Sequence, residues 1–308
     1  MAEINIQTKV DLAPLTTFQI GGPAKFFVSV RAATELEAAV AWAAERRENY
    51  FILGGGSNIL VSDQGFDGLV IKMANDRLEI DGEKITIGAG LNLSRAVMAA
   101  MTAGLSGLEW AAGIPGSVGG AVRGNAGAYG GEMKDAVAEV RVFNTAGGQW
   151  RAYETVDCRW GYRDSLFKHQ GNLLIWEISL QLHGADKDEV SSRSQDINRQ
   201  RQTKSPLEPS AGCVFQNLYA SDLVPALKDK FAAAIKYNKL PAAAVIEALG
   251  WKGRSLGQAL VSPEHANFIV NAGQARAEEV VGLINQLKTQ AKDLGLDLTT
   301  EIELVGFN

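Results

Sequence analysis

The stretch GIPGSVGGAVRGNAGAYGG, residues 113–131, holds eight glycines in nineteen residues. Most of its other residues are apolar, whereas a flexible linker is polar and rich in serine. Glycine permits positive φ angles and a close approach of the backbone to a ligand. The stretch therefore predicts a glycine-rich segment inside a folded domain, either one that wraps a ligand or one that is merely buried.

A shorter glycine loop, Gly54-Gly55-Gly56-Ser57-Asn58, follows the apolar run 50–53, which predicts a buried strand. Such a loop can direct several backbone N–H groups toward one anion. On its own, the loop is explained equally well by a plain tight turn. Together, the two glycine segments suit a ligand with two phosphates and a flat ring, which favours a dinucleotide site over two buried loops.

The motifs that are absent narrow the type of nucleotide fold. The chain has no G-x-G-x-x-G after a strand, which disfavours a Rossmann site. It has no Gly-Lys dipeptide, which excludes a P-loop. A nucleotide-binding fold of another type is therefore expected.

Length, charge and residue counts exclude several classes of protein. The 308 residues suggest two domains or three small ones. A net charge of −5 disfavours nucleic-acid and anionic-membrane partners, which bind basic surfaces. No signal peptide or membrane span is visible, since the most apolar stretch, 96–122, is interrupted by Glu109 and Pro115. Two cysteines without a CxxC pair and three histidines without a zinc motif predict a cytoplasmic protein with no metal.

Hydrophobic periodicity and turn residues predict a mixture of helices and strands. The expected helices are 32–47, 92–103, 186–204, 224–237, 241–249 and 278–294. The expected strands are 50–53, 69–72, 78–80, 84–87, 137–143, 149–153, 173–182, 268–270 and 298–305. A capping box at Thr34 and Glu37 opens the first helix, and Ala146-Gly147-Gly148 turns a hairpin. The mixed order predicts an α+β fold with a domain boundary near residues 183–186.

A set of motifs in fixed order carries a resemblance to a known family. They are Phe18-x-Ile20-Gly21-Gly22-x-Ala24, Gly54–Asn58, Ile114-Pro115-Gly116-x-x-Gly119-Gly120, Asn125–Gly130, Gly161-Tyr162-Arg163-Asp164-Ser165, Ser210–Asn217, Lys252-Gly253-Arg254-x-x-Gly257, Ser262-x-x-His265–Asn271 and Glu301–Gly306. Over nearly its whole length the chain resembles the UDP-N-acetylenolpyruvoylglucosamine reductase (MurB) family. The short interval between Arg163 and Gly212 is similar to the compact type II form.

The resemblance implies an α+β FAD-binding domain of the PCMH/vanillyl-alcohol-oxidase-like type, followed by an α+β substrate-binding domain. We expect residues 1–184 to bind FAD, in subdomains of about 1–72 and 73–184, and residues 185–308 to bind substrate. The implied reaction uses NADPH to reduce FAD and then reduces UDP-N-acetylglucosamine enolpyruvate to UDP-N-acetylmuramate for peptidoglycan synthesis. A monomer is expected.

The resemblance also assigns site residues. The substrate-binding residues are Tyr162 and Asn217, although Leu218 stands where a proline often follows in the family. The cofactor-binding residues are Gly54, Gly55, Gly56, Ser57, Asn58, Ile114, Pro115, Gly116, Ser117, Gly119, Gly120, Gly124, Asn125, Gly127, Ala128 and Tyr129.

Three catalytic residues follow from matching the family's motifs to the needs of the chemistry. Hydride addition to an enol ether builds negative charge that must be stabilised and then protonated. Cys213 stands where the family usually has a serine proton donor, and a thiol, with its ordinary pKa near ~8.5, gives up a proton more readily than an alcohol. Arg163 matches an arginine that holds the substrate carboxylate, and Glu301 a glutamate on the substrate side.

Alternative interpretations stay open. Cys213 could be a small buried hydrophobe, Arg163 a surface partner of Asp164, and Glu301 an ordinary strand residue like Glu303. The segment 226–235 predicts an added amphipathic helix, more simply a surface decoration than a substrate lid, and His265 and Asn267 are expected to be structural. The whole chain could also be a flavin oxidase of the same fold or a catalytically silent nucleotide-binding relative.

Overall fold

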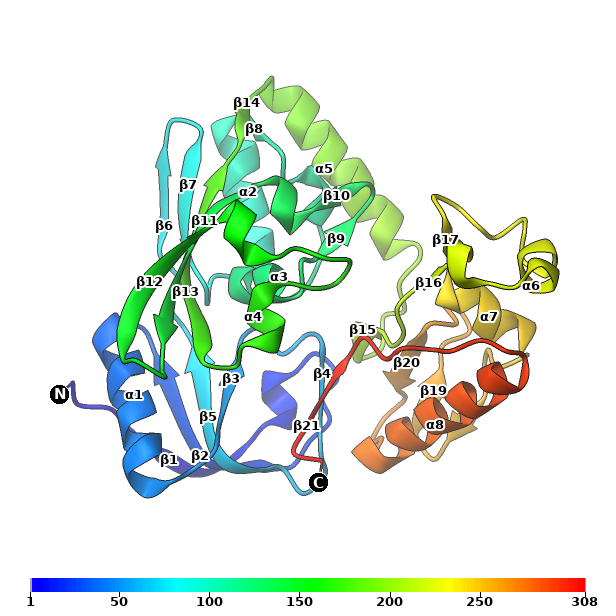
Figure 1. The fold of residues 1–308 in the computed structure, drawn as a ribbon, viewed down its shortest axis with the longest axis horizontal. Coiled ribbons are helices and arrows are strands. Elements are labelled where there is room, and N and C mark those ends of the chain that lie inside the picture. The colour runs from blue at the N-terminus through cyan, green and yellow to red at the C-terminus, as the bar shows by residue number, and fades with distance from the viewer. Residues whose placement is uncertain (1, 308) are drawn as a thin grey trace. The chain divides into compact units, whose positions relative to one another are not determined.

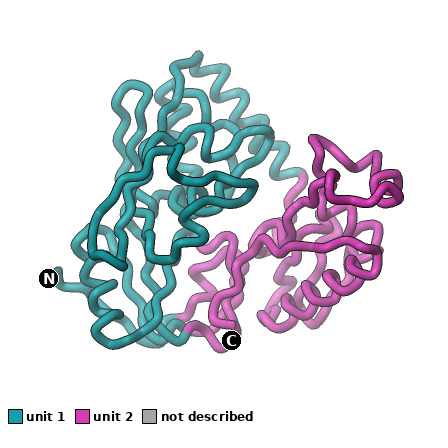
Figure 2. The backbone as a smooth tube through the Cα atoms, viewed as in Figure 1, with its two compact units in different colours: residues 1–10, 24–55, 67–203 teal, residues 11–23, 56–66, 204–308 magenta. Residues whose placement is uncertain are grey.

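The computed structural model describes residues 2–307, and its internal contacts divide them into two compact units (Figures 1 and 2). Unit 1 takes in the chain up to Val10, residues 24–55 and residues 67–203. Unit 2 takes in residues 11–23, 56–66 and the chain from Lys204 onward. These bounds describe which residues pack together, and they do not assign a function to either unit. The division of roles at residues 184 and 185 stays a prediction.

Unit 1 carries most of the sheet structure. Its helices are α1 (Ala33–Arg46), α2 (Leu93–Ala103), α3 (Val118–Arg123), α4 (Leu166–His169) and α5 (Lys187–Gln202). Its strands are β1 (Gln7–Asp11) and β2 (Pro23–Val30), each of which has one end residue in unit 2, β3 (Tyr50–Leu53), β5 (Phe66–Met73, which also begins in unit 2), β6 (Leu78–Asp81), β7 (Lys84–Gly88), β8 (Leu105–Ser106), β9 (Gly127–Ala128), β10 (Gly131–Glu132), β11 (Val137–Asn144), β12 (Gln149–Glu154), β13 (Leu173–Gln181) and β14 (His183–Gly184).

Two sheets of unit 1 share one hydrophobic core. The first has the order β1-β2-β5-β3 and the second the order β12-β11-β13-β7-β6. Leu36 of α1 packs in this core with Leu69 and Ile71 of β5 and with Ile85 and Ile87 of β7, all fully buried. The central strands β5 and β13 have almost continuous runs of buried residues, which shows that both of their faces are covered. The expected hairpin is confirmed, since β11 pairs antiparallel with β12 on either side of residues 145–148.

The first helix is confirmed, but the capping box predicted at Thr34 and Glu37 is wrong. The cap lies two residues earlier, where Glu35 accepts hydrogen bonds from the backbone N–H groups of Arg31 and Ala32 at 2.6 and 3.0 Å. Glu37 instead accepts from the indole N–H of Trp150 at 2.5 Å. The spacing of Thr34 and Glu37 predicted a local cap, but Glu37 makes a tertiary contact with Trp150 instead.

Unit 2 is built from both early and late segments of the chain. Its helices are α6 (Pro225–Lys230), α7 (Ala242–Ala248) and α8 (Ala277–Asp293). Its strands are β4 (Ile59–Val61), β15 (Ser210–Cys213), β16 (Leu218–Tyr219), β17 (Lys239–Leu240), β18 (Ser255–Leu256), β19 (Ala259–Val261), β20 (Phe268–Asn271) and β21 (Glu303–Val305). The main sheet has the order β15-β20-β19-β18, while β21 pairs parallel with β4.

Two predicted elements of unit 2 are shorter than expected. The helix predicted at 224–237 stops at Lys230, and the chain continues in turns at residues 231–234. Tyr237 and Asn238 then take positive φ angles in a tight turn between Lys236 and Lys239. That turn lies in an arm whose two ends pair as β16 and β17.

The strand predicted at 298–305 is confirmed only for Glu303–Val305. The preceding residues have apolar side chains buried at Leu298 and Ile302, which mimics a strand pattern. Their backbone makes single hydrogen bonds to the 214–216 segment instead of a continuous ladder. None of the helices described within residues 2–307 has the length and hydropathy needed to cross a membrane.

Candidate active site

The two glycine segments meet in unit 1, backbone against backbone. A Cβ atom built on Gly55 would lie 2.4 Å from the Cα of Gly116, and one on Gly54 would lie 2.6 Å from the Oγ of Ser117. Real Cβ atoms do not approach other atoms so closely, so the backbone contact at Gly55 requires glycine, whereas a Cβ at Gly54 would displace the hydroxyl of Ser117. The structure thus brings together four predicted cofactor residues as one narrow cradle, named here the glycine cradle (Gly54, Gly55, Gly116, Ser117).

The connection between β7 and α2 supports this cradle. The N–H of Val118 donates to the carbonyl of Leu91, and the N–H of Gly119 to that of Ala89, both at 2.9 Å. A Cβ on Gly119 would lie 2.7 Å from the Cβ of Ala89. The long glycine segment is therefore held by regular backbone hydrogen bonds.

Lys72 of β5 is a residue near the cradle that sequence reasoning missed. Its ammonium group donates a hydrogen bond to the carbonyl of Gly54. Burial lowers the pKa of Lys72 from its ordinary value. A lysine inside the apolar run Leu69–Met73 is a signal that could have marked this position, because lysine is rarely placed in a buried strand without a partner.

The centre of the long glycine segment is a short helix, which the sequence did not predict. The Oγ of Ser117 accepts from the N–H of Gly120 at 3.3 Å and starts α3, and Gly124 ends it. Residues 114–115 lead into the cradle ahead of Ser117. Small residues allow this helix to pack closely on its neighbours.

Asn125 ties the end of the glycine segment to two other loops. Its side chain is 1% exposed. The Nδ2 donates to the Oε2 of Glu132 at 2.9 Å and to the carbonyl of Gly161 at 2.8 Å, and the Oδ1 accepts from the N–H of Lys134 at 3.1 Å. This network uses the whole side-chain amide, so its role in the structure is to hold loops together.

The last predicted cofactor residues of this segment lie in a small hairpin. Gly127 and Ala128 form β9, which pairs with β10. Tyr129 takes φ +50° and is 45% exposed, and the guanidinium of Arg201 on α5 lies 5.4 Å from the centre of its ring. An exposed aromatic ring beside a cation is suited to contact a flat ligand.

Arg163 stands in a tight turn next to the glycine segment. The N–H of Gly161 donates to the carbonyl of Asp164 at 2.9 Å, and the N–H of Asp164 donates back at 3.2 Å. Arg163 takes φ +55°, an uncommon conformation for a non-glycine residue, and its guanidinium lies 5.6 Å from the ring centre of Tyr162. Both predicted residues are half-buried.

Ser165 anchors that turn from its other end. The hydroxyl of Ser165 is fully buried and donates to the carbonyl of Arg123 at 2.7 Å. Asp164 has its own partner, since both of its carboxylate oxygens lie 2.8 Å from the Nε2 of His169. Sequence reasoning missed the anchoring role of Ser165, although the motif contains it.

The remaining cofactor residues of the short glycine loop lie in unit 2. A Cβ on Gly56 would lie 2.2 Å from the carbonyl O of Leu15, which again requires glycine. The side-chain amide of Asn58 donates to the carbonyl of Glu301 at 3.2 Å, and the N–H of Glu303 donates to the carbonyl of Asn58 at 3.0 Å. Ser57, between them, is half-buried.

Two predicted catalytic residues, Cys213 and Glu301, lie on adjacent segments of unit 2. Cys213 ends β15, and the N–H of Glu301 donates to the carbonyl of Val214 at 2.7 Å. Phe215 and Thr300 form an antiparallel bridge between the same two segments. Both Cys213 and Glu301 are half-buried, so the structure brings a thiol and a carboxylate to neighbouring backbone positions.

Asn217, predicted to contact substrate, has a structural partner. Its Oδ1 accepts from the N–H of Ala242 at 3.1 Å, the first residue of α7. Helix starts leave N–H groups unpaired, and a side-chain oxygen satisfies one of them. The substrate role of Asn217 stays a prediction.

His265 lies half-buried beside Asn267. Its Nδ1 accepts from the N–H of Asn267 at 3.3 Å, and its ring packs edge-on against Phe268. Burial is the main cause that lowers the pKa of His265 below its ordinary 6.5, with Lys252 acting in the same direction and Glu247 against it. The expected structural role of His265 fits these contacts.

The lowered pKa of His265 predicts how stability changes with pH. Below about pH 6.5 the unfolded chain binds a proton that the folded protein still rejects, so the free energy of unfolding falls as pH falls toward the folded pKa. His265→Asn keeps an acceptor near the N–H of Asn267 but cannot titrate. We expect urea unfolding between about pH 5 and 8 to show a shallower pH slope for this variant, and equal slopes would contradict the assignment.

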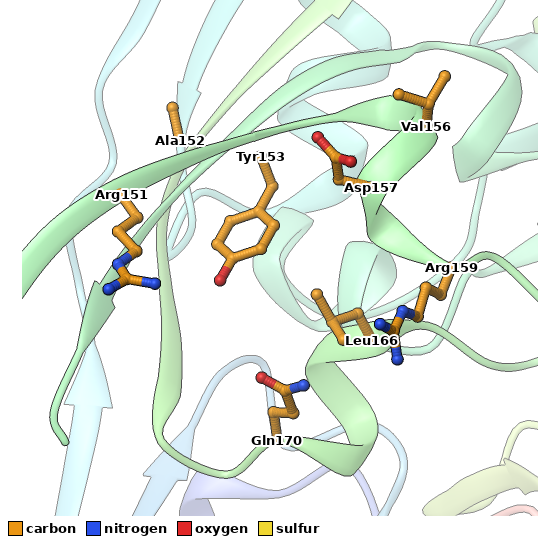
Figure 3. A pocket seen from close by; sticks show the side chains of 8 residues that line it. All are labelled: Arg151, Ala152, Tyr153, Val156, Asp157, Arg159, Leu166 and Gln170. Atoms are coloured by element: carbon orange, nitrogen blue, oxygen red, sulfur yellow. The ribbon is translucent and has the colours of Figure 1, made fainter.

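Unit 1 also has a surface pocket that is separate from the predicted site residues. Figure 3 shows its lining, with Tyr153 between the arginines 151 and 159. None of the predicted site residues lines this pocket. Within residues 2–307 no group of three or more His, Cys, Asp or Glu side chains is arranged to hold a metal ion.

Known proteins resemble the chain in both halves. Residues 24–153 match the family model of an FAD binding domain, and residues 202–305 match that of the UDP-N-acetylenolpyruvoylglucosamine reductase C-terminal domain. The UDP-N-acetylenolpyruvoylglucosamine reductase of Solibacter usitatus is 37% identical over 304 residues, covering 98% of this chain and 97% of that protein. The protein of the same name from Syntrophomonas wolfei is 38% identical, covering 94% and 92%.

A solved structure extends the similarity to three dimensions. The crystal structure of UDP-N-acetylenolpyruvylglucosamine reductase (MurB) from Thermus caldophilus superposes with a TM-score of 0.79 at 34% identity, covering 99% of this chain and 100% of that one. The expected α+β class is confirmed, with an FAD binding domain matched ahead of the reductase C-terminal domain. The chain belongs to the UDP-N-acetylenolpyruvoylglucosamine reductase family.

Proposed function

We propose that the protein uses NADPH and bound FAD to reduce UDP-N-acetylglucosamine enolpyruvate to UDP-N-acetylmuramate, a peptidoglycan precursor. The observation that carries the proposal is the 37% identity to a reductase of that name over 98% of the chain. A flavin oxidase is less well supported, because residues 1–150 contain no histidine or cysteine to tether a flavin covalently. A silent relative is less well supported because all three catalytic positions hold reactive side chains.

The glycine cradle fits FAD. Gly55 packs so closely on Gly116 that a Cβ would not fit there, and glycine segments of this kind offer backbone N–H groups that can bind a pyrophosphate. Ser117 caps the helix that follows the cradle, Asn125 ties the end of that helix to the 161–164 turn, and Tyr129 offers an exposed ring. When bound, the flavin carries hydride from NADPH to the substrate, and the protein orients the partners.

Arg163 would hold the substrate carboxylate. A guanidinium stays charged at all working pH values and can make two parallel hydrogen bonds to a carboxylate. The tight turn at 161–164, fixed by Asn125 and Ser165, gives the arginine a constrained starting point. A constrained cation stabilises developing negative charge without having to reorganise during the reaction.

Cys213 would donate the proton, and Glu301 would act on the substrate side. Addition of hydride to the substrate generates an enolate-like carbon, and this carbon must receive a proton from a positioned acid. The thiol of Cys213 gives that proton, and the carboxylate of Glu301, on the adjacent segment, orients or polarises the reacting group. Tyr162 and Asn217 would complete the substrate contacts.

Glu301→Gln is expected to slow the transfer from reduced flavin to substrate and to leave the reduction of flavin by NADPH near normal. The amide keeps the size of the side chain but loses its charge. Stopped-flow absorbance of the flavin measures the two half-reactions separately. Equal slowing of both would instead indicate a structural role for Glu301.

Flavin colour tests the proposed function as a whole. Purified protein should carry an extractable yellow flavin that NADPH bleaches without oxygen and that recovers its colour when the enolpyruvyl substrate is added. A colourless protein that FAD does not reconstitute would refute the proposal. Bleaching by an alcohol substrate followed by rapid recovery in air would favour an oxidase instead.

The proposal includes a monomer that works in the cytoplasm, with flavin and substrate bound by residues 1–184 and 185–308. The nucleotide substrates NADPH and UDP-sugars are cytoplasmic metabolites, and neither cysteine is in a disulfide. Light scattering after gel filtration measures the mass in solution. A mass of 33.0 kDa is expected for a monomer.

A further inference from the structure

Asn267 pairs its side-chain amide with both backbone groups of Phe215. The Nδ2 donates to the carbonyl of Phe215 at 2.8 Å, and the Oδ1 accepts from the N–H of Phe215 at 3.0 Å. The N–H of Val214 also donates to the backbone carbonyl of Asn267 at 2.8 Å. Asn267 is 3% exposed, so these three bonds hold, away from water, the two residues that follow Cys213.

The backbone needs this partner because β15 leaves its ladder with β20 just before this point. Ser210 pairs with Val270 and Cys213 with Phe268, so β15 has one more residue than β20 between the two pairs. The extra residue makes a bulge, in which Gly212 takes φ +80°. A bulge redirects the side chains beside it, and the ladder ends with the pair of Cys213 and Phe268, so the next backbone groups need other partners.

The same backbone stretch faces the Glu301 segment on its other side. The carbonyl of Val214 accepts from the N–H of Glu301 at 2.7 Å, and the N–H of Gln216 donates to the carbonyl of Thr299 at 2.9 Å. Residues 214–216 are therefore held between Asn267 and the 299–301 segment. A shift of this stretch would move Cys213 and Glu301 relative to each other.

We propose that Asn267 is a positioning residue for proton transfer: its amide fixes the backbone that carries Cys213 in register with the Glu301 segment. The inference rests on the proposed function, in which Cys213 is the proton donor. A carboxamide suits the position because it carries a donor and an acceptor side by side on one planar group. Removing either one leaves a buried backbone group of Phe215 unsatisfied.

Asn271, the last residue of β20, is a matched control four residues after Asn267. It is 6% exposed, and its Oδ1 accepts from the N–H groups of Gly273 and Ala275 at 3.1 and 2.9 Å. Its Nδ2 donates to the carbonyl of Phe18 at 3.3 Å. Asn271 thus has the same chemistry and burial as Asn267, but it holds segments without a proposed catalytic residue.

The test compares Asn267→Asp with Asn271→Asp in the flavin-bound enzyme. At alkaline pH the new carboxylate faces the carbonyl of Phe215 and cannot donate to it. We expect Asn267→Asp to slow substrate-dependent reoxidation of the flavin about tenfold or more, with a larger solvent deuterium effect, while NADPH reduces the flavin at a near-normal rate. Asn271→Asp should lower thermal stability and leave the ratio of the two half-reactions unchanged.

Acid pH should rescue Asn267→Asp. Once protonated, the carboxyl group introduced by this substitution regains a donor for the carbonyl of Phe215, so reoxidation should recover as pH falls. His265 contacts this position, and Glu264, Lys252 and Glu247 lie around His265. Wild type and Asn271→Asp contain these same neighbouring titratable groups. Dividing the reoxidation rate of Asn267→Asp by the rate of each control at every pH therefore isolates the effect of the carboxyl group at position 267.

A thiol probe separates this inference from the proposed function. Cys158 is fully buried and its pKa is raised to about 12 by burial, so iodoacetamide should label Cys213 alone. We expect Asn267→Asp to change the labelling rate of Cys213 severalfold, with Asn271→Asp matching wild type. This result would stand even if the enolpyruvyl compound failed to reoxidise wild-type flavin, which would refute only the proposed function.

The inference is overturned if Asn267→Asp matches Asn271→Asp in the labelling rate and in the ratio of half-reactions. If Asn267→Asp does not fold, Asn267→Gln replaces it, because glutamine keeps both hydrogen-bonding groups and displaces them by one methylene. The same selective loss is expected from Asn267→Gln. Equal slowing of both half-reactions by Asn267→Gln would also overturn the inference.

Discussion

Cys213→Ala should abolish turnover, whereas Cys213→Ser should retain it. Alanine has no proton to give, and loss of a positioned general acid costs about 10²–10⁴-fold in rate. Serine restores the group that the family usually carries at this position and keeps the side chain nearly the same size. Steady-state oxidation of NADPH with the enolpyruvyl substrate measures both variants, and stopped-flow absorbance should place the loss in reoxidation of the flavin.

Cys158→Ala is the matched control for this result. Cys158 is the other cysteine of the chain, and its thiol is fully buried and donates to the carbonyl of Glu154 at 3.3 Å. Its replacement removes a thiol without touching the segment of Cys213 and should leave the half-reactions unchanged, at some cost in stability. A fully active Cys213→Ala would refute the assignment of Cys213 as proton donor.

Gly55→Ala should produce protein that does not retain flavin. The new Cβ would lie 2.4 Å from the Cα of Gly116 and 2.7 Å from the N of Ser117, so two backbone segments must separate. Overpacking costs about 1–3 kcal/mol where side chains can adjust, and backbone atoms adjust less. Each ~1.4 kcal/mol lost from the binding-competent state weakens flavin binding tenfold.

The absorbance of the purified variant near the visible flavin band, together with titration by FAD, measures the effect. Gly171→Ala is the matched control, because a Cβ there meets no atom within 4 Å and its φ is not in the left-handed region. We expect Gly171→Ala to bind flavin like wild type. A yellow, fully loaded Gly55→Ala with unchanged thermal stability would mean that the two glycine segments do not pack as described.

Local pattern was enough to predict elements whose residues contact near neighbours in sequence. The helix at 33–46 and the hairpin of β11 and β12 follow from periodicity and turn residues within about fifteen positions. The cap of α1 was misplaced because Trp150, more than a hundred residues away, takes the side chain of Glu37. Tertiary contacts of this range leave no local signal.

The candidate site was only partly visible in the sequence. Glycine density marked residues 54–56 and 113–131 as special, but nothing in the chain shows that Gly55 lies against Gly116. The sequence predicts no more than a structural role for Asn267. A single buried amide leaves no periodic pattern in the sequence, and its partner Phe215 lies 52 residues earlier in the chain. The roles of Cys213, Arg163 and Glu301 came from family motifs, since each residue alone has a more ordinary explanation.

The pairing of β21 with β4 has a consequence for how the chain folds during synthesis. Glu303–Val305 lie parallel to Ile59–Val61, and the N–H of Ser62 donates to the carbonyl of Val305 at 2.8 Å. These contacts join residues about 240 positions apart, a separation that slows folding because a long loop must close first. Unit 1 is fully synthesised by residue 203, whereas residues 11–23 and 56–66 must wait for the final strand. Vectorial synthesis thus leaves β4 without this partner strand until residues 303–305 have been made, the interval in which a chaperone would be most useful.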